Sequence, residues 1–169
     1  PHALIGDREC TACHNPHSAD FSALLVFTEG GQVCFDCHQS SNVVSNRMTH
    51  QPAKEGQCDS CHVSHSQGEK THLVREGKAL CDECHQVPEK GATMVHAPVA
   101  TGDCLACHDP HGSPIMLSLS KEFPELCWQC HDKERVAGKG EHETVETDTI
   151  VCTECHSPHS SMKDQLLKY

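Results

Sequence analysis

Apolar residues occur only in short, interrupted groups along this chain. The longest continuous apolar run covers residues 23–27, and charged or turn-forming residues interrupt every periodic stretch. We therefore expect no long strand and only short helices. Candidates are 121–137, where Pro124 suits a helix start, and 160–168, after the cap residues Ser160 and Ser161. An apolar run of this length is far too short to span a bilayer.

The composition leaves little material for an ordinary hydrophobic core. Hydrophobic residues make up 36% of the chain, but 14 of them are cysteines, and aromatic residues contribute only 4%. Such side chains could hardly bury enough surface to stabilise a chain of 169 residues. Another apolar component must therefore supply the interior.

All 14 cysteines fall in seven copies of the pattern Cys-x-x-Cys-His. Two thiols at this spacing can form thioethers at one edge of a porphyrin, and the adjacent histidine then lies beneath the iron as its proximal ligand. The predicted attachment residues are Cys10, Cys13, Cys34, Cys37, Cys58, Cys61, Cys81, Cys84, Cys104, Cys107, Cys127, Cys130, Cys152 and Cys155. The predicted proximal ligands, called motif histidines below, are His14, His38, His62, His85, His108, His131 and His156. The sequence therefore predicts seven covalently attached haem c groups.

Two other cysteine chemistries fit this pattern poorly. A zinc site uses paired Cys-x-x-Cys motifs, or one such motif with a spaced histidine pair, and does not require a histidine directly after every second cysteine. A disulfide framework gives no reason for seven adjacent histidines either. Haem attachment explains both features.

Seven large, mostly apolar macrocycles would also supply the missing interior. We therefore expect a multihaem cytochrome c fold with few short α-helices, mostly irregular loops wrapped around a row of seven haems, and essentially no β-sheet. Without haem, we expect no stable fold.

The motifs form a longer repeat. Consecutive motifs begin 23 to 25 residues apart, and alternate motifs are flanked by further histidines. Leading histidines precede the first motif of each repeat: His2, His50, His96 and His142. Trailing histidines stand three residues after the histidine of that motif: His17, His65, His111 and His159. We expect one unit, 1–169, built of repeats 1–46, 47–92 and 93–138 and a half repeat 139–169.

This pattern resembles the doubled Cys-x-x-Cys-His multihaem cytochromes c, in which CxxCHxPH alternates with LCxxCH. The Leu-Cys form appears at Leu80 and Leu126, whereas Val33 replaces leucine before Cys34 and Ser64 replaces proline in the second repeat. The resemblance covers nearly the whole chain. It implies bis-histidine haems in close stacked pairs, little regular secondary structure and a role in respiratory electron transfer. Some similar cytochromes polymerise into extracellular wires.

Chain geometry restricts the distal ligands. Two histidines on opposite faces of one haem have Cα atoms roughly 12–13 Å apart, whereas three extended residues span at most about 11 Å. A trailing histidine therefore cannot serve the haem of its own first motif. We assign the leading histidines His2, His50, His96 and His142 to the first haem of each repeat, and His17, His65 and His111 to the second. A crossed arrangement fits the counts equally well.

This assignment leaves His72 and His159 without an iron. His72 fits a solvent-exposed polar residue. His159 is the candidate ligand of a haem in a neighbouring molecule, which would build an open head-to-tail filament. The alternatives are a surface histidine, or one whose haem was lost with a shortened C-terminus.

Bis-histidine ligation favours outer-sphere electron transfer, because a six-coordinate iron binds no substrate. We expect a seven-haem carrier for long-range electron transfer in anaerobic or extracellular respiration, or a polymerising wire subunit, rather than an enzyme. The alternative is a multihaem redox enzyme that acts on a small nitrogen or sulfur species at one open haem. That enzyme needs a haem without a distal histidine, and nine histidines outside the motifs give no sign of one.

The net charge and the site of haem attachment predict the partners and the location of the protein. The net charge is −11 and the thirteen basic residues form no run, which argues against nucleic acid. Basic redox partner proteins or extracellular electron acceptors fit better, although the charge could also serve solubility alone. Thioether haem attachment takes place outside the cytoplasm, so we expect an exported chain, periplasmic or at the cell surface, from which a leader has been removed.

Overall fold

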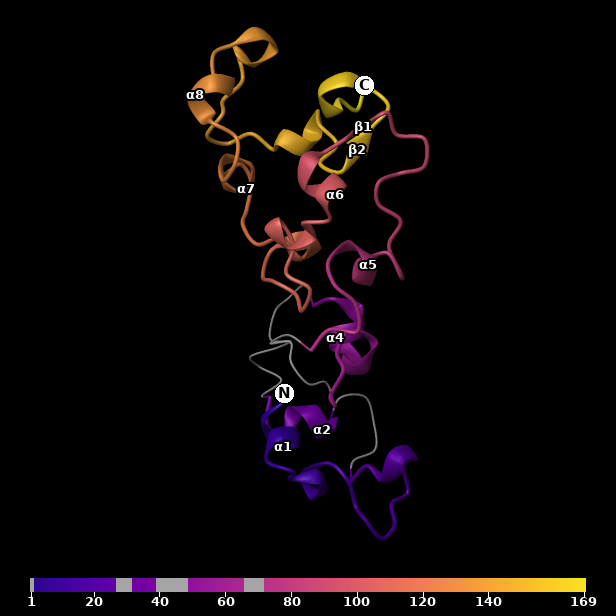
Figure 1. Cartoon of the computed structure of the whole chain (residues 1–169). Helices are drawn as coiled ribbons and strands as arrows, with labels where there is room; N and C mark the ends of the chain where they lie inside the picture. Colours follow the sequence, from indigo (N-terminus) through magenta and orange to yellow (C-terminus); the bar gives the residue numbers. More distant parts are fainter. Residues whose placement is uncertain (1, 27–31, 39–48, 66–71) are drawn as a thin grey trace. The chain divides into compact units, whose positions relative to one another are not determined.

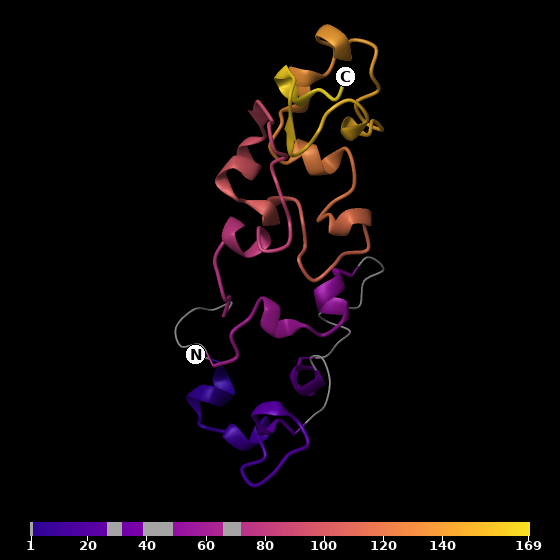
Figure 2. The same cartoon turned by 90° about the vertical axis from the view of Figure 1, so that its right-hand side faces the viewer.

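The computed structural model describes residues 2–26, 32–38, 49–65 and 72–169. Figure 1 shows short helical turns separated by long loops, and Figure 2 gives the same chain from a second direction. This confirms the expected fold class of few short helices, little sheet and mostly loop. The repeat boundary expected at 46/47 lies outside the described residues. No helix in the described ranges is long and apolar enough to cross a membrane.

All helices in the described ranges are one turn or slightly longer. The α-helices are α1 (Ala3–Gly6), α2 (Gln32–Phe35), α4 (Gln51–Lys54), α5 (Lys78–Cys81), α6 (Ala97–Thr101), α7 (Glu125–Trp128) and α8 (Lys133–Val136). The 3-10 turns are η1 (Cys10–Ala12), η2 (Ser22–Leu24), η3 (Cys58–Ser60), η4 (Cys104–Ala106), η5 (Met116–Ser118), η6 (Gly140–His142), η7 (Cys152–Glu154) and η8 (Asp164–Leu166). The helix expected within 121–137 is present as α7 and α8, and Pro124 caps the start of α7.

The prediction of a helix at 160–168 is wrong. Ser160–Ser161 forms strand β2, which pairs antiparallel with β1 (Met94–Val95) in a two-stranded sheet. Farther on, Gln165 and Leu166 have positive φ angles of 55° and 59°, which interrupt any right-handed helix. The two serines are therefore paired through their backbone and do not cap a helix.

Three leading histidines are the N-cap residues of short helices. His2, His50 and His96 precede α1, α4 and α6, with ψ angles of 132° to 135°. In each helix the carbonyl of the histidine accepts the N–H four residues on. Pro52 and Pro98 stand in the first turns of α4 and α6, where a fixed φ favours the helix and the missing N–H costs nothing. The local sequence thus fixes the backbone from which each leading histidine projects.

Gly102 ends α6 in the left-handed conformation, with φ +80°. A Cβ at this position would lie 2.7 Å from the Cβ of Lys78 in α5. Only glycine therefore allows the end of α6 to approach α5 this closely.

The described chain forms two compact units. The first contains residues 1–76 together with 110–114, and the second contains residues 77–109 together with 115–169. Among the described residues, the only buried hydrophobic side chains are Leu119 and Leu126. Several large apolar side chains are exposed instead, including Leu105, Met116, Leu117 and Met162. The polypeptide alone thus lacks the apolar interior that an ordinary domain of this size requires.

Candidate haem centres

All seven Cys-x-x-Cys-His motifs form the same single helical turn. The histidine N–H donates to the carbonyl of the first cysteine at 2.8 to 3.1 Å, and the N–H of the second cysteine donates to the same carbonyl at 3.2 to 3.3 Å. Residues three and four apart lie on one side of such a turn. Each motif therefore presents two thiols and an imidazole together, as covalent haem attachment requires.

After the first motif of each repeat, the chain returns antiparallel to the motif histidine. We call this segment the return loop; the four loops are 15–25, 63–73, 109–119 and 157–167, and residues 66–71 of the second loop lie outside the described ranges. Each ends at a leucine bridged to the motif histidine: His14 with Leu25, His62 with Leu73, His108 with Leu119 and His156 with Leu167. Two backbone hydrogen bonds close each loop, such as Asp109 N–H to the Ser118 carbonyl at 2.8 Å and Ser120 N–H to the Cys107 carbonyl at 2.8 Å.

The return loop also places a backbone carbonyl against the motif histidine. The Nδ1 atoms of His14, His108 and His156 lie 2.7, 3.0 and 2.9 Å from carbonyl oxygens nine residues downstream. These carbonyls belong to Ala23, Leu117 and Gln165. A carbonyl can only accept, so Nδ1 carries the proton and Nε2 keeps its lone pair. The loop thus sets the tautomer that binds iron.

The residues that supply these carbonyls have left-handed backbones. Ala23, Leu117 and Gln165 have φ angles of 56°, 60° and 55°, and the residue after each one also has a positive φ. This conformation costs a residue other than glycine roughly 1–2 kcal/mol. The same strain recurs beside the motif histidine in three repeats, where it turns the carbonyl toward Nδ1.

Sequence reasoning did not find these carbonyl residues, because the interaction belongs to the backbone. A signal is nevertheless present. Leucine stands eleven residues after the motif histidine of every first motif, at Leu25, Leu73, Leu119 and Leu167. That fixed spacing marks the end of the return loop.

Six motif histidines each face a second histidine ring. The distances between ring centroids are 6.1 Å for His38 with His2, 5.8 Å for His14 with His65, and 6.0 Å for His62 with His111. They are 6.0 Å for His131 with His96, 6.0 Å for His108 with His159, and 6.1 Å for His156 with His142. Each pair lies within one compact unit.

These distances fit an iron held between two imidazoles. Bonds of about 2 Å from iron to each Nε2 place the two ring centres about 6 Å apart. Direct ring packing would not select the same separation six times, or pair a motif histidine with a leading or trailing histidine in every case. The residues present therefore fit bis-histidine haem.

The pairing differs from the assignment that the sequence suggested. Leading histidines lie beside the second motif of their own repeat, as His2 beside His38 and His96 beside His131. Trailing histidines lie beside the first motif of the preceding repeat: His65 beside His14, His111 beside His62 and His159 beside His108. The expected links of His2 and His96 to the first motifs, and of His65 and His111 to the second motifs, are therefore wrong. His142 lies beside His156, in the first motif of its own repeat, as the assignment expected.

The two-stranded sheet explains part of this arrangement. His96 follows β1 and His159 precedes β2, and the N–H of His96 donates to the carbonyl of His159 at 3.0 Å. Nδ1 of His96 lies 2.9 Å from the carbonyl of Pro158, which fixes its tautomer as well. The sheet therefore holds side by side the two histidines that face the motif histidines His131 and His108.

The pairing changes which histidine is left over. His159 lies beside His108 within the chain, so the prediction that it binds a neighbouring molecule's haem loses its basis. Its pKa is lowered mainly by burial and also by His108 and His96, which favours the neutral imidazole that an iron ligand must be. Within the described ranges, no ring contact joins His17 to another histidine. His72 makes an edge contact with the ring of His2 at 6.2 Å.

Cysteines of consecutive motifs lie close together. Burial raises the pKa of the Cys34 thiol to about 11, with further contributions from a hydrogen bond to Cys58 and from nearby Cys13. In the second unit, burial and a hydrogen bond to Cys152 raise the pKa of Cys127 to about 12.

The Cys107 thiol lies near the thiols of Cys127 and Cys130 in the second unit. Burial raises its pKa, with a contribution from nearby Cys130. The attachment cysteines of motifs one, two and three therefore adjoin in chain order, as do those of motifs five, six and seven.

The seventh motif lines an apolar cavity. Its wall includes both cysteines and the motif histidine of this motif, the facing His142, and Trp128 from the sixth motif. Val136, Val145, Ile150 and Val151 supply aliphatic surface. A wall of this composition suits a flat, largely apolar cofactor.

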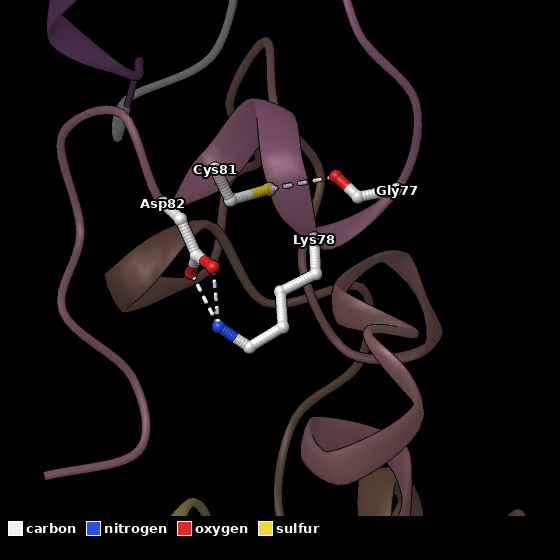
Figure 3. A network of polar contacts seen from close by, with 4 residues as sticks. All are labelled: Gly77, Lys78, Cys81 and Asp82. Atoms are coloured by element: carbon white, nitrogen blue, oxygen red, sulfur yellow. Dashed lines mark hydrogen bonds and ion pairs between the residues drawn. The ribbon is translucent and has the colours of Figure 1, made fainter.

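The second motifs are placed by short helices. Figure 3 shows the fourth motif, in which Cys81 lies at the end of α5 and its Sγ is 3.9 Å from the carbonyl oxygen of Gly77. Lys78 contacts both carboxylate oxygens of Asp82, at 2.5 and 2.6 Å. This ion pair spans one helical turn and holds Asp82, the residue after Cys81, in place.

All fourteen cysteines are free thiols, so none forms a disulfide in this structure. Among the described residues, no group of three or more His, Cys, Asp or Glu side chains is arranged to hold a bare metal ion.

The turns, histidine pairs and loop-dominated fold define a multihaem c-type cytochrome, a class of electron-transfer protein. The doubled CXXCH motif family matches residues 2–43, 50–90, 96–136 and 142–169, and the chain belongs to this family. Each match lies within one of the four repeats expected from the sequence. No curated protein matches the chain.

Proposed function

We propose that this chain carries seven bis-histidine haems and transfers electrons over long distances by an outer-sphere mechanism. The observation that supports this most strongly is the set of six histidine pairs, each with ring centroids 5.8 to 6.1 Å apart and each containing one motif histidine. Haem iron bound in this way supplies a one-electron ferric/ferrous couple. The process served is anaerobic or extracellular respiration.

The protein residues hold the metal ligands in a fixed arrangement. Carbonyls of the return loops keep Nδ1 of His14, His108 and His156 protonated, which fixes ring orientation and increases ligand basicity. With two histidines per iron, the ligand set can stay the same on reduction. The residues therefore favour electron transfer without substrate binding, and we propose that the chain is not an enzyme.

The thiol contacts support an order for electron flow. Within the first unit Cys13, Cys34 and Cys58 bring motifs one, two and three together. Within the second unit Cys107, Cys127, Cys130 and Cys152 do the same for motifs five, six and seven. We propose that electrons pass between neighbouring motifs in chain order within each unit.

Cyanide binding separates this function from the enzyme alternative. The ferric protein should show only low-spin haem by electron paramagnetic resonance (EPR), and excess cyanide should leave its visible spectrum unchanged. A high-spin signal or a cyanide-induced shift in the untreated native protein would reveal an open haem and support a redox enzyme acting on a small nitrogen or sulfur species.

His17 supports a further proposal about assembly. Three trailing histidines lie beside the first motif of the preceding repeat, whereas in the described ranges no histidine ring faces the exposed His17. We propose that His17 lies at a contact between copies of this chain in a cytochrome wire. His17 then takes the place of His159 as the residue proposed at that contact.

Native material tests the assembly proposal. Electron microscopy should show filaments that are lost in His17→Ala and kept in Gln57→Ala, a surface control. Discrete monomers in the wild type would leave the soluble carrier, and filaments that survive His17→Ala would contradict a role of His17 in the contact between copies.

Export and partners follow from the same chemistry. Covalent haem attachment takes place outside the cytoplasm, so we propose a periplasmic or extracellular location. The net charge of −11 favours basic redox partner proteins or cationic acceptors.

A further inference from the structure

The indole nitrogen of Trp128 is buried without a hydrogen-bond partner. Among the described residues it is the only buried side-chain nitrogen or oxygen in this state. An unpaired buried donor costs about 1–3 kcal/mol, so such a group calls for an acceptor.

Trp128 lies in the wall of the cavity at the seventh motif, with His142, His156 and Cys152. The aliphatic part of this wall matches the apolar body of a porphyrin but provides no acceptor for an N–H group. A haem bound here would bring two carboxylates into the neighbourhood, and a carboxylate is the stronger kind of acceptor.

The nearby cationic side chains already have partners. Helix α8, which contributes Val136 to the wall, carries Lys133 and Arg135. Lys133 pairs with Asp148, and Arg135 pairs with Asp132 at 3.1 Å. Beside the Thr147 hydroxyl, which also lines the cavity, the indole N–H is a buried donor available to a carboxylate here.

The position of Trp128 also links two haem sites. It lies between Cys127 and Cys130, which belong to the sixth motif, while its ring lines the cavity of the seventh. The Cys127 thiol is in turn hydrogen-bonded to Cys152. A hydrogen bond from Trp128 would orient the seventh haem relative to the attachment turn of the sixth.

We propose that Trp128 is a positioning residue whose indole N–H donates a hydrogen bond to a propionate carboxylate of the haem held by His142 and His156. This inference rests on the proposed seven-haem function. It assigns Trp128 a polar role beyond apolar packing on the porphyrin.

Trp128→Phe tests the hydrogen bond, because it keeps an aromatic ring and removes only the donor. Phenylalanine suits this turn, since Phe35 occupies the same position in the second motif of the first repeat. Without the donor, the carboxylate charge is less compensated and favours ferric iron. The reduction potential of one haem should fall, with up to a tenfold change in its ferric/ferrous ratio, equivalent to 59 mV.

Gln129→Ala is the matched control, because this exposed side chain lies in the same motif and bonds only the Leu126 carbonyl. Intact mass should give seven haems in the wild type and both variants. Seven haems with no potential shift beyond that of Gln129→Ala would overturn the role of Trp128 alone. Fewer than seven haems in the wild type would overturn the proposed function itself.

A measurement on the wild type covers the case in which the variant fails to fold. The indole N–H proton of ¹⁵N-labelled holoprotein should exchange slowly with solvent and change its chemical shift strongly between ferric and ferrous states. An ordinary exchange rate and a shift independent of oxidation state would contradict a hydrogen bond to haem.

Discussion

The first and second motifs of the third repeat form the same helical turn in different surroundings. The first motif, with His108, is followed by a return loop whose Leu117 carbonyl lies 3.0 Å from Nδ1 of that histidine. The second motif, with His131, follows the short helix α7, and the chain then enters α8. In the described ranges, the ring of His131 makes no comparable hydrogen bond to a backbone carbonyl.

The difference shows that the return loop serves two sites. It supports the motif histidine of its own repeat, and it carries the trailing histidine that serves the preceding repeat. The last return loop fixes His156 through Gln165 and presents His159 to His108. Second motifs lack this connection and take their facing histidine from the start of their own repeat, as His131 does from His96.

The largest expected effect is the change of iron spin state when a trailing histidine is substituted. His159→Ala should leave one of seven irons without its distal ligand and produce a high-spin ferric signal by EPR. His17→Ala should leave the spectrum of the isolated chain low-spin, because no motif histidine of the described chain faces His17. A low-spin His159→Ala variant, or a high-spin His17→Ala variant, would reverse the assignment of return loops to preceding repeats.

An intermediate effect is expected at the helices that support second motifs. Gly102→Ala should lower the free energy of unfolding of the holoprotein by about 1–3 kcal/mol, because its Cβ would overlap with Lys78 of α5. Gly91→Ala is the control, since Gly91 also has positive φ, at +89°, but no atom lies within 4 Å of its added Cβ. Equal thermal midpoints for the two variants would show that the close approach of α5 and α6 does not matter.

The smallest effect concerns strain in the return loop. Gln165→Gly should raise the free energy of unfolding by up to about 1 kcal/mol, because glycine adopts positive φ without a Cβ clash. Gln129→Gly should lower it by about 0.5–1 kcal/mol, because Gln129 has a right-handed φ of −62°. Thermal denaturation of the two holoproteins measures both changes. A destabilised Gln165→Gly protein would show that the left-handed turn is not strained.

The features that depend on local spacing could be predicted from the sequence. The motif turns need only residues three and four apart, and the scarcity of apolar side chains predicted a fold dominated by loops. Pro124 correctly indicated the start of α7. The flanking histidines were recognisable because they recur at regular offsets from each motif.

The histidine pairing could not be read from the sequence, because it depends on contacts between distant segments. Strands β1 and β2 are two residues each, too short for any alternating pattern, yet they place His96 beside His159. The left-handed residues Leu117 and Gln165 are of types that rarely adopt positive φ. Within 160–168 the signal is the spacing of Leu167 from His156, which does not by itself distinguish a turn from a helix.

Intact-mass analysis of the native protein tests the central claim most directly. If every Cys-x-x-Cys-His turn carries a thioether-linked haem, the measured mass should equal that of the polypeptide plus seven haems, and denaturation should release none. A mass corresponding to fewer haems, or to free thiols with bound zinc, would contradict the account.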